Sequence, residues 1–304
     1  MRCLIIGGGG FMGEAITRGL LAAGAASVRV YDLPDRAGVI AALPDAEFIG
    51  GDYLDLGVHD ALFADTDVVV YLSSDSHPSA SMEDPERDAR NNILPALRMM
   101  ESCRHHGVRR VLFASSGGTI YGDANESVDE RHVKHPLSAY GVHKLAIEHY
   151  LELYHLQHGL GTYSLRVANA YGPGQLKGTV IGAVAAFLRK ILAGETIEIW
   201  GDGEIVRDYV WIDDIVSAFV VFALSGEDHP SGHYNVGSGS GHSLNEVIAQ
   251  ICEITGQTAR VDYLPPRGFD VPHIVLDAGK LTRQTGWQAR TTLAEGIRTL
   301  LDTF

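Results

Sequence analysis

A glycine-rich turn at residues 7–13, Gly-Gly-Gly-Gly-Phe-Met-Gly, constrains the fold of this chain more than any other segment. The apolar residues 3–6 before it are long enough for a buried strand, and the apolar spacing of residues 14–21 after it predicts a helix. Such a turn presents backbone N–H groups and a helix N-terminus to a pyrophosphate. The glycines at positions 7, 10 and 13 give the spacing G-x-x-G-x-x-G. Its first gap is one residue longer than the first gap of G-x-G-x-x-G. Many loops contain glycine only because it adopts positive φ. The turn alone therefore does not show that a pyrophosphate binds here.

An acidic residue stands where a dinucleotide site needs one. Residues 27–31, Ser-Val-Arg-Val-Tyr, predict a second strand, and Asp32 ends it about 20 residues after the turn. A carboxylate in this place accepts the ribose hydroxyls of NAD and repels the 2′-phosphate of NADP, so NAD is predicted. Arg36 lies nearby in the sequence, so NADP stays an alternative to NAD. The alternative role for Asp32 is a carboxylate that caps a turn.

Composition excludes several classes of protein. The net charge of −14 over 304 residues argues against a nucleic-acid or anionic-membrane surface. Three scattered cysteines suggest no disulfide framework, the apolar runs are too short to span a membrane, and no signal peptide is recognised. We therefore expect a cytoplasmic protein. Cys103 with His105 and His106 lacks a second ligand pair at a metal-binding spacing, so no metal is predicted.

Strand and helix patterns alternate through the first half of the chain. Further strands are predicted at 46–49, 67–72, 110–114 and 162–167, and long helices at 86–106 and from Ser138 onward. This alternation predicts an α/β protein with a Rossmann-type doubly wound parallel sheet, whose ligands bind at the carboxyl ends of the strands.

The pattern loosens after Asn169, which predicts a smaller interleaved α/β lobe that binds substrate. Helices are expected there at 180–193, 213–224, 243–255 and 292–301, with one short strand within 195–208. The predicted division assigns 1–168 and a returning segment, 209–236, to the NAD-binding domain. Residues 169–208 and 237–304 form the substrate lobe.

Tyr140 and Lys144 form the strongest candidate for catalysis. Residues four apart share one face of a helix. A phenol of pKa about 10 is a poor base at neutral pH, but a neighbouring ammonium and a cationic nicotinamide both favour the phenolate. Lowering the pKa of Tyr140 by three units needs roughly 4 kcal/mol, which two close cations can supply in a partly buried site. The alternative is a surface Tyr and Lys on an amphipathic helix.

Together these motifs resemble the extended short-chain dehydrogenase/reductases, and among them the NAD-dependent nucleotide-sugar epimerase/dehydratase family of UDP-glucose 4-epimerase type. The resemblance covers nearly the whole chain. It rests on residues 7–13, 32, 51–52, 115–122, 140 with 144, 165–169, 201–203, 207–209 and 234–237.

The resemblance implies a role for each matching residue. The implied catalytic residues are Tyr140 and Lys144, with Ser116 or Thr119 supplying a hydroxyl. The implied NAD-binding residues are Gly7, Gly10, Phe11, Met12, Gly13, Asp32, Asp52, Tyr53, Leu72, Ser73, Ser74, Asn91, Tyr140, Lys144 and Ala168. The implied nucleotide-sugar ligands are Asn169, Trp200, Arg207 and Arg267. Arg207 has the alternative of pairing with Asp208 or Asp213.

The sequence departs from the family pattern at two positions. Gly117 stands where a catalytic Ser or Thr is usual. The 4,6-dehydratases carry Thr-Asp-Glu where this chain has Gly117-Gly118-Thr119, so the acid and base for dehydration are lacking. Ile274 stands where relatives approach the C2 group of the sugar, and a residue smaller than Tyr there would admit an N-acetyl group.

The resemblance therefore implies an NAD-dependent nucleotide-sugar 4-epimerase of the UDP-glucose or UDP-GlcNAc type. Hydride leaves C4, a 4-keto sugar turns over, and hydride returns on the opposite face. The alternatives are a 4-ketoreductase or another epimerase of the family and, less favoured, a non-catalytic NAD-binding regulator. A homodimer through the two long helices is expected, with no nucleic-acid or membrane partner.

Overall fold

The computed structural model describes residues 1–57, 61–124, 126–176, 182–226, 229–268 and 270–304. These residues form two compact units, each assembled from three segments of the chain. Unit 1 comprises residues 1–116, 138–166 and 216–234, and unit 2 comprises 117–137, 167–215 and 235–304.

A seven-stranded sheet organises unit 1. Its order is β11-β7-β5-β4-β1-β2-β3, and the four pairings from β5 to β3 are parallel. The strands are β1 (Arg2–Ile6), β2 (Ser27–Asp32), β3 (Ala46–Gly50), β4 (Val68–Tyr71), β5 (Arg110–Ser116), β7 (Gly161–Val167) and β11 (Gly232–Val236). The strand order reverses direction between β1 and β4, which is the switch point where doubly wound sheets bind ligands. The predicted Rossmann-type sheet is confirmed.

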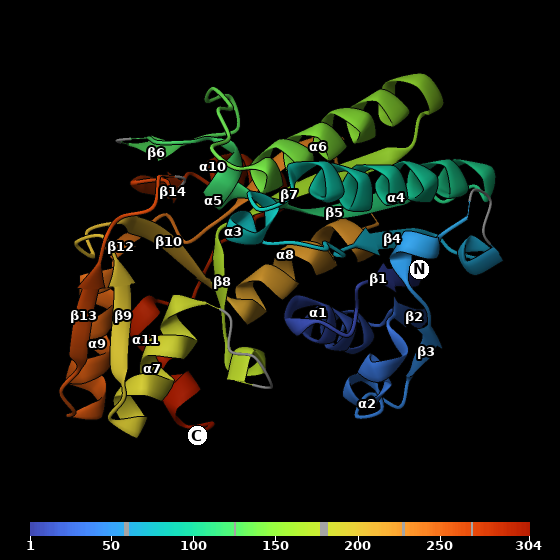
Figure 1. The fold of residues 1–304 in the computed structure, drawn as a ribbon. Helices are drawn as coiled ribbons and strands as arrows, with labels where there is room; N and C mark the ends of the chain where they lie inside the picture. Colours follow the sequence, from blue (N-terminus) through green and yellow to red (C-terminus); the bar gives the residue numbers. More distant parts are fainter. Residues whose placement is uncertain (58–60, 125, 177–181, 227–228, 269) are drawn as a thin grey trace. The chain divides into compact units, whose positions relative to one another are not determined.

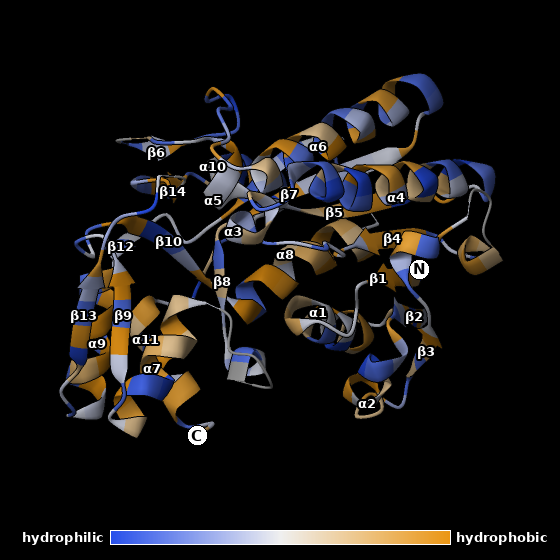
Figure 2. Ribbon diagram, in the orientation of Figure 1, coloured by the Kyte–Doolittle hydropathy of each residue, from blue (hydrophilic) through white to orange (hydrophobic). Residues whose placement is uncertain are grey.

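Helices cover both faces of this sheet (Figure 1). Helices α4 (Pro85–His105) and α6 (Ala139–His158) lie on one face, and α1 (Phe11–Ala22) and α8 (Ile212–Leu224) lie on the other. Strands β1 and β4 are strongly hydrophobic, as expected of central parallel strands (Figure 2). The core beneath α4 and α6 contains Leu4, Ile6, Val69, Tyr71, Met99, Met100, Val111, Phe113, Ile147 and Leu151.

Helix α6 begins and ends for local reasons. The Ser138 hydroxyl accepts the N–H of Gly141 at 3.2 Å, so the predicted cap at Ser138 is present. Gly159 ends the helix at φ +71°, a conformation that favours glycine. Between these ends, α6 carries the fully buried Glu148, whose carboxylate accepts the guanidinium of Arg166 and the hydroxyl of Ser115.

Unit 2 has shorter strands and smaller sheets. One sheet has the order β12-β10-β14-β6 with β8 also on β10, and β9 pairs with β13. The strands are β6 (Ser127–Val128), β8 (Asn169–Tyr171), β9 (Thr196–Trp200), β10 (Val206–Trp211), β12 (Gly241–Ser243), β13 (Arg260–Leu264) and β14 (His273–Leu276). The helices are α5 (Gly117–Ile120), α7 (Ala183–Ala193), α9 (Leu244–Thr255), α10 (Gly279–Thr285) and α11 (Leu293–Leu301).

The secondary-structure predictions for unit 2 are partly wrong. One short strand was expected within 195–208, and the structure has β9 there and the start of β10 as well. The predicted helix 180–193 is observed from Ala183, with residues 180 and 181 outside the described part of the chain. Ser243 and Thr292 begin α9 and α11 with capping boxes, so both of those predicted starts are correct to within one residue.

The cysteines are free thiols within the described structure. Cys103 is fully buried in the unit 1 core, where its Sγ lies 3.6 Å from Met99 Sδ, and this burial raises the pKa of the thiol. Across the described residues, His, Cys, Asp and Glu form no cluster suited to a metal ion. Within the same residues, no helix combines the length and the hydrophobicity needed to cross a bilayer.

Candidate active site

The glycine-rich turn has the geometry of a phosphate cradle. Gly7 has φ +85°, and a Cβ on Gly13 would lie 2.4 Å from the Cα of Gly8, so only glycine fits between turn and helix. Helix α1 starts at Phe11, and Gly10 before it provides no capping side chain. The first N–H groups of α1 are therefore open to an anion, which the helix dipole also favours.

Asp32 lies beside this turn at the carboxyl end of β2. Its Oδ2 accepts the Gly9 N–H at 2.7 Å, and its Oδ1 accepts the Leu33 N–H, also at 2.7 Å. The carboxylate is thus fixed against the glycine turn. These contacts are compatible with both predicted roles of Asp32, the ribose-binding acid and the turn cap. The carboxylate caps its own turn at Leu33 and also contacts the glycine turn at Gly9. Arg36 packs its Cβ against Gly9.

A cavity of about 350 Å³ in unit 1 collects most of the residues implied to bind NAD. It is lined by Gly7, Gly10, Asp32, Leu33, Arg36, Asp52, Tyr53, Leu54, Leu72, Ser73, Ser74 and Asp75. Phe11, Met12 and Gly13 form the adjoining first turn of α1. A glycine cradle, a ribose-facing carboxylate and small hydroxyls in one cavity fit a dinucleotide.

The structure distinguishes the two asparagines at the start of α4. Asn91 donates to the carboxylate of Asp75 at 2.9 Å on the exposed side. Asn92 is buried, and its Oδ1 accepts the Ser74 hydroxyl and the Asp75 N–H, both at 3.1 Å. Asn92 therefore orders the loop after β4 that lines the cavity. The resemblance implies that Asn91 or Asn92 orients the helix or the cofactor, with Asn91 named for the site, because sequence periodicity does not separate the two; the role of Asn91 stays a prediction.

Tyr140 and Lys144 share one face of α6, as their spacing predicts. The Lys144 ammonium donates to the carbonyl of Ala114 near the end of β5 at 3.0 Å, and it lies 5.4 Å from the centre of the Tyr140 ring. The backbone N–H of Tyr140 donates to the hydroxyl of Ser81 at 3.0 Å. Lys144 is buried, and burial lowers the pKa of its ammonium to about 8. The pair is therefore built into unit 1 rather than lying free on its surface.

The pKa of Tyr140 differs from the predicted direction. Without cofactor, burial and then the negative charge of Asp88 raise the pKa of the phenol to about 12. Burying a phenolate costs free energy, and this cost opposes the two cations expected near Tyr140. Of these two cations, only Lys144 belongs to the protein, so Tyr140 is a phenol until another positive charge arrives.

The two hydroxyls proposed to assist Tyr140 lie in different units. Ser116 is the last residue of β5 in unit 1, where its neighbour Ser115 is already engaged with Glu148 at 2.5 Å. Thr119 lies in α5 of unit 2, and its Oγ1 is buried with no hydrogen-bond partner among the described residues. The roles of both residues remain predictions.

Unit 2 brings together three residues implied to bind the nucleotide sugar. The Arg267 guanidinium lies 5.5 Å from the centre of the Trp200 ring and pairs with Asp270 at 2.9 Å. Arg207 is close enough to Arg267 for the two charges to oppose each other, and burial is the main cause that lowers its pKa. Two arginines beside an exposed indole suit a nucleoside diphosphate.

Arg207 has no carboxylate partner within the described residues. Its side chain donates only to the carbonyl of Val206. Asp208 instead accepts the N–H groups of Ser238, Gly239 and Leu276, and Asp213 accepts the indole N–H of Trp211. The alternative of a structural ion pair for Arg207 therefore has no support in the structure.

The remaining residues of the predicted set also lie in unit 2. Asn169 begins β8, pairs in register with Tyr209, and has its Oδ1 3.2 Å from where a Cβ on Gly118 would lie. Ala168 donates its N–H to Val236 and packs beside an apolar cluster that includes Ile274. Ile274 is buried, so the substrate preference inferred from it stays a prediction.

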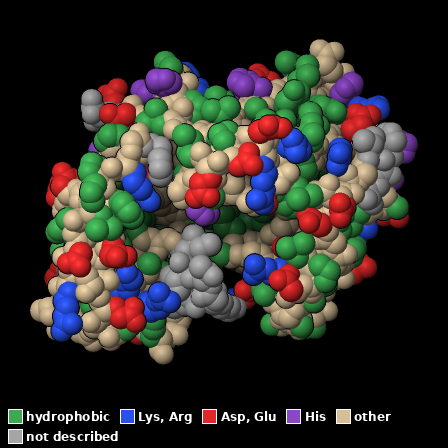
Figure 3. All heavy atoms as spheres, in the orientation of Figure 1, with side chains coloured by type: hydrophobic (Ala, Val, Ile, Leu, Met, Phe, Trp, Pro, Cys, Tyr) green, Lys and Arg blue, Asp and Glu red, His purple; other side chains and the backbone are tan. Residues whose placement is uncertain are grey.

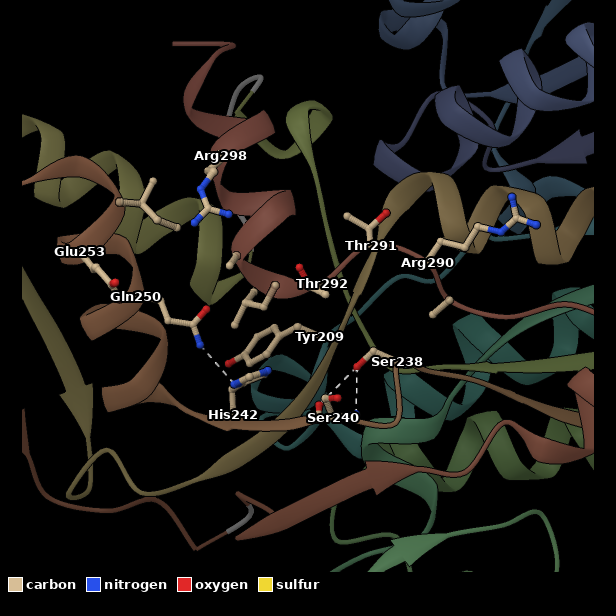
Figure 4. Close-up of a pocket in the computed structure, with 14 residues that line it drawn as sticks. Tyr209, Ser238, Ser240, His242, Gln250, Glu253, Arg290, Thr291, Thr292 and Arg298 are labelled. Atoms are coloured by element: carbon tan, nitrogen blue, oxygen red, sulfur yellow. Dashed lines mark hydrogen bonds between the residues drawn. The ribbon is translucent and has the colours of Figure 1, made fainter.

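A further cavity in unit 2 involves no residue of the predicted site. It has a volume of about 550 Å³ and lies among β10, β12, α9 and α11 (Figure 4). Tyr209, which is 4% exposed, lines it with a hydroxyl that has no partner among the described residues. His242 and Gln250 close one side, with 3.4 Å between their side-chain nitrogens.

The chain is similar to known proteins of one family. The model of the NAD-dependent epimerase/dehydratase family matches residues 3–237. A UDP-glucose 4-epimerase of Mycolicibacterium smegmatis is 34% identical over 312 residues, with 100% of this chain and 98% of the relative covered.

Solved structures agree with this result. A UDP-glucose 4-epimerase of Thermotoga maritima with UDP-glucose superposes with a TM-score of 0.91 at 33% identity. A UDP-glucose 4-epimerase of Thermus thermophilus in complex with NAD gives a TM-score of 0.89 at 35% identity. Both alignments cover 100% of this chain and 98% of the other.

Proposed function

Because this chain belongs to the NAD-dependent epimerase/dehydratase family, we propose that it inverts the configuration at C4 of a UDP-sugar of the glucose or N-acetylglucosamine type. The observation that carries the proposal is the Tyr140–Lys144 pair at the carboxyl end of the sheet. Helix α5, by contrast, reads Gly-Gly-Thr-Ile and offers no carboxylate for dehydration. The named relatives are all UDP-glucose 4-epimerases.

Each group of residues has a separate task in this reaction. The cavity at the glycine turn would hold NAD, which would supply reversible hydride transfer to and from C4 of the sugar, so no external redox partner would be consumed. Tyr140 removes the proton of the 4-hydroxyl and later returns it, while Lys144 supplies positive charge beside the phenol. Arg207 and Arg267 bind the diphosphate, and Trp200 lies beside the base. Orientation of the sugar supplies much of the rate acceleration.

A panel of UDP-, dTDP-, GDP- and CDP-sugars tests the proposal. We expect NMR of the products to show inversion at C4 of a UDP-hexose, without stoichiometric formation of NADH in the absorbance spectrum. Inversion at another carbon would contradict the C4 assignment. Net consumption or release of NADH with each turnover would instead identify a 4-ketoreductase.

We also propose that the protein forms a homodimer through α4 and α6. Five large apolar side chains are exposed on these helices: Leu94, Val142, Tyr150, Leu153 and Leu156. Leu156 is 71% exposed, and hydrophobic side chains are visible along α6 at the upper edge of the molecule in Figure 3. An apolar face on two adjacent long helices suits a four-helix interface between two copies.

The double variant Leu153→Glu/Leu156→Glu is expected to be monomeric. Buried carboxylates at the centre of the proposed interface would lack partners, so the dimer would lose several kcal/mol of association free energy. Sedimentation equilibrium should give a mass near the 32.8 kDa of one chain, against about twice that for the parent. Val133→Glu is the control, because Val133 is 74% exposed and belongs to neither helix. A monomeric parent would contradict the proposal.

A further inference from the structure

Asp88 and His143 form a buried carboxylate–imidazole pair next to Tyr140. The reaction described so far gives this pair no role. His143 Nδ1 is 2.6 Å from the Oδ2 of Asp88, and both side chains are 2% exposed. The His143 ring meets the Tyr140 ring edge to face, with 5.0 Å between their centres. The pair joins α4 to α6 one helical turn from the phenol.

The carboxylate of Asp88 is held by three side chains. Its Oδ1 accepts the hydroxyl of Ser76 and the amide N–H of Asn92, the latter at 3.2 Å, and its Oδ2 faces the Nδ1 of His143. All three partners donate hydrogen bonds to the carboxylate oxygens, which fixes their position. The carboxylate is therefore a fixed negative charge within the protein.

The geometry of His143 shows that this charge is not neutralised. Its Nδ1–H is used by Asp88, while its Nε2 is buried and has no hydrogen-bond partner among the described residues. A proton on Nε2 would be a buried donor without an acceptor, which is costly. The ring is therefore neutral, in agreement with burial and the nearby Lys144 lowering the pKa of His143 to about 4.

Two other charged groups of α6 lie near the phenol. Glu148 is paired with Arg166, and the Lys144 ammonium interacts with the negative charges of both Asp88 and Glu148, so it offsets the charge of Asp88 in part. The negative charge of Asp88 still raises the pKa of Tyr140. Among the described residues, helix α3 (Pro78–Ser81) contributes the uncharged Ser81 hydroxyl, and β5 contributes the carbonyl of Ala114. Asp88 is the acid that α4 directs toward this site.

We propose that Asp88, oriented by His143, is a positioning residue that adds to burial in opposing ionisation of the Tyr140 hydroxyl in the cofactor-free protein and helps to set the pH at which this hydroxyl becomes a base. The inference rests on the proposed function only in taking Tyr140 as the base. The cationic nicotinamide ring of NAD would oppose the Asp88 charge, so the phenolate would form mainly when the cofactor is bound. The resting enzyme would thus carry no reactive phenolate.

Titration of the Tyr140 phenol tests this directly. The full chain is labelled with carbon-13 at tyrosine Cζ, Tyr140 is assigned with a Tyr140→Phe variant, and spectra are recorded with and without NAD. At a pH of about 10, where an unperturbed tyrosine is half ionised, Asp88→Asn should show about tenfold more Tyr140 phenolate than the parent. Asparagine has nearly the same size and removes the charge, but it keeps only one acceptor oxygen and places an NH2 group where the other oxygen stood.

Two variants separate charge from packing. His143→Gln keeps an N–H donor and the Asp88 charge, so its phenolate fraction should match that of the parent even if its stability falls. Glu86→Gln removes a charge from the exposed surface of the same helix and should also match the parent. Equal phenolate in Asp88→Asn and the parent, or an equal increase in His143→Gln, would overturn the proposal.

The measurement contains no sugar, so it stands whether or not the chain is a 4-epimerase. If epimerisation is observed, the acidic limb of the kcat profile of Asp88→Asn should move to lower pH by about one unit. KM for the sugar should be unchanged, since the side-chain hydrogen bonds of Asp88 within the described residues go to Ser76, Asn92 and His143, none of which is implied to bind the sugar. A loss of activity without a shift of the profile would indicate a purely structural role and would contradict the inference.

Discussion

Replacing Tyr140 with phenylalanine is expected to lower kcat for sugar epimerisation by about a hundred- to ten-thousand-fold, the contribution typical of a positioned acid–base group. The variant removes one hydroxyl and leaves the backbone N–H that Ser81 accepts and the ring that packs against His143. The variant should still bind NAD, as followed by calorimetry, because the residues of the cavity at the glycine turn are unchanged even though one implied NAD contact is lost. The rate is measured on the UDP-sugar that the substrate panel identifies.

Tyr150→Phe is the matched control for that experiment. Tyr150 lies on the same helix, is 37% exposed, and has no part in the proposed chemistry. Its kcat should equal that of the parent. If Tyr140→Phe turned over sugar at the parental rate while Tyr150→Phe did the same, a base other than Tyr140 would have to carry the reaction.

Replacing Glu148 with alanine is expected to cost about 3–5 kcal/mol of unfolding free energy. Glu148 and Arg166 are 0% and 1% exposed, and the guanidinium reaches both carboxylate oxygens, at 3.0 and 2.7 Å. Removing the acid leaves a buried guanidinium without its counter-charge and frees the Ser115 hydroxyl. Urea denaturation followed by circular dichroism should show a lower midpoint with an unchanged slope.

Glu152→Ala is the control, because it makes the same glutamate-to-alanine substitution on the exposed face of α6. Glu152 is one turn further along α6, and its side chain is 54% exposed beside His149. An exposed pair of this kind contributes little, so the midpoint should stay near that of the parent. Equal losses in the two variants would mean that α6 is sensitive to any substitution, and the assignment to the buried pair would fail.

Much of unit 1 was predictable because its signals are local. Residues 68–71 are all apolar, as a strand covered on both faces requires, and the structure buries all four. Ser138 begins α6 because its hydroxyl caps the first turn, and the glycine turn at 7–13 follows a strand and starts a helix as expected. In each case the responsible contact lies within a few residues.

Unit 2 was less predictable because its strands depend on distant partners. β6 has only two residues, and it is a strand because Ser127 and Val128 pair with Val275 and Leu276. Likewise, β13 alternates weakly and is held by its parallel register with β9, Arg260 opposite Thr196. Neither pairing leaves a periodicity in the sequence.

The candidate site divides in the same way. The cavity at the glycine turn gathers the predicted neighbours of Gly7 and Asp32, since they follow successive parallel strands. Which asparagine of α4 is buried, and which direction the pKa of Tyr140 takes, both depend on side-chain burial. Whether a polar side chain is buried depends on tertiary packing. The residue type at one position does not reveal that packing.

The place of β11 has a consequence for synthesis of the chain. In the seven-stranded sheet, β7 at residues 161–167 is flanked by β11, which comes from residues 232–236. Until those later residues leave the ribosome, one side of β7 has no strand to pair with. At about 5–20 residues per second this interval lasts several seconds, during which an open strand edge can recruit the wrong neighbour. The nascent chain is most exposed to aggregation in that interval, and a chaperone that covers a strand edge would help it most there.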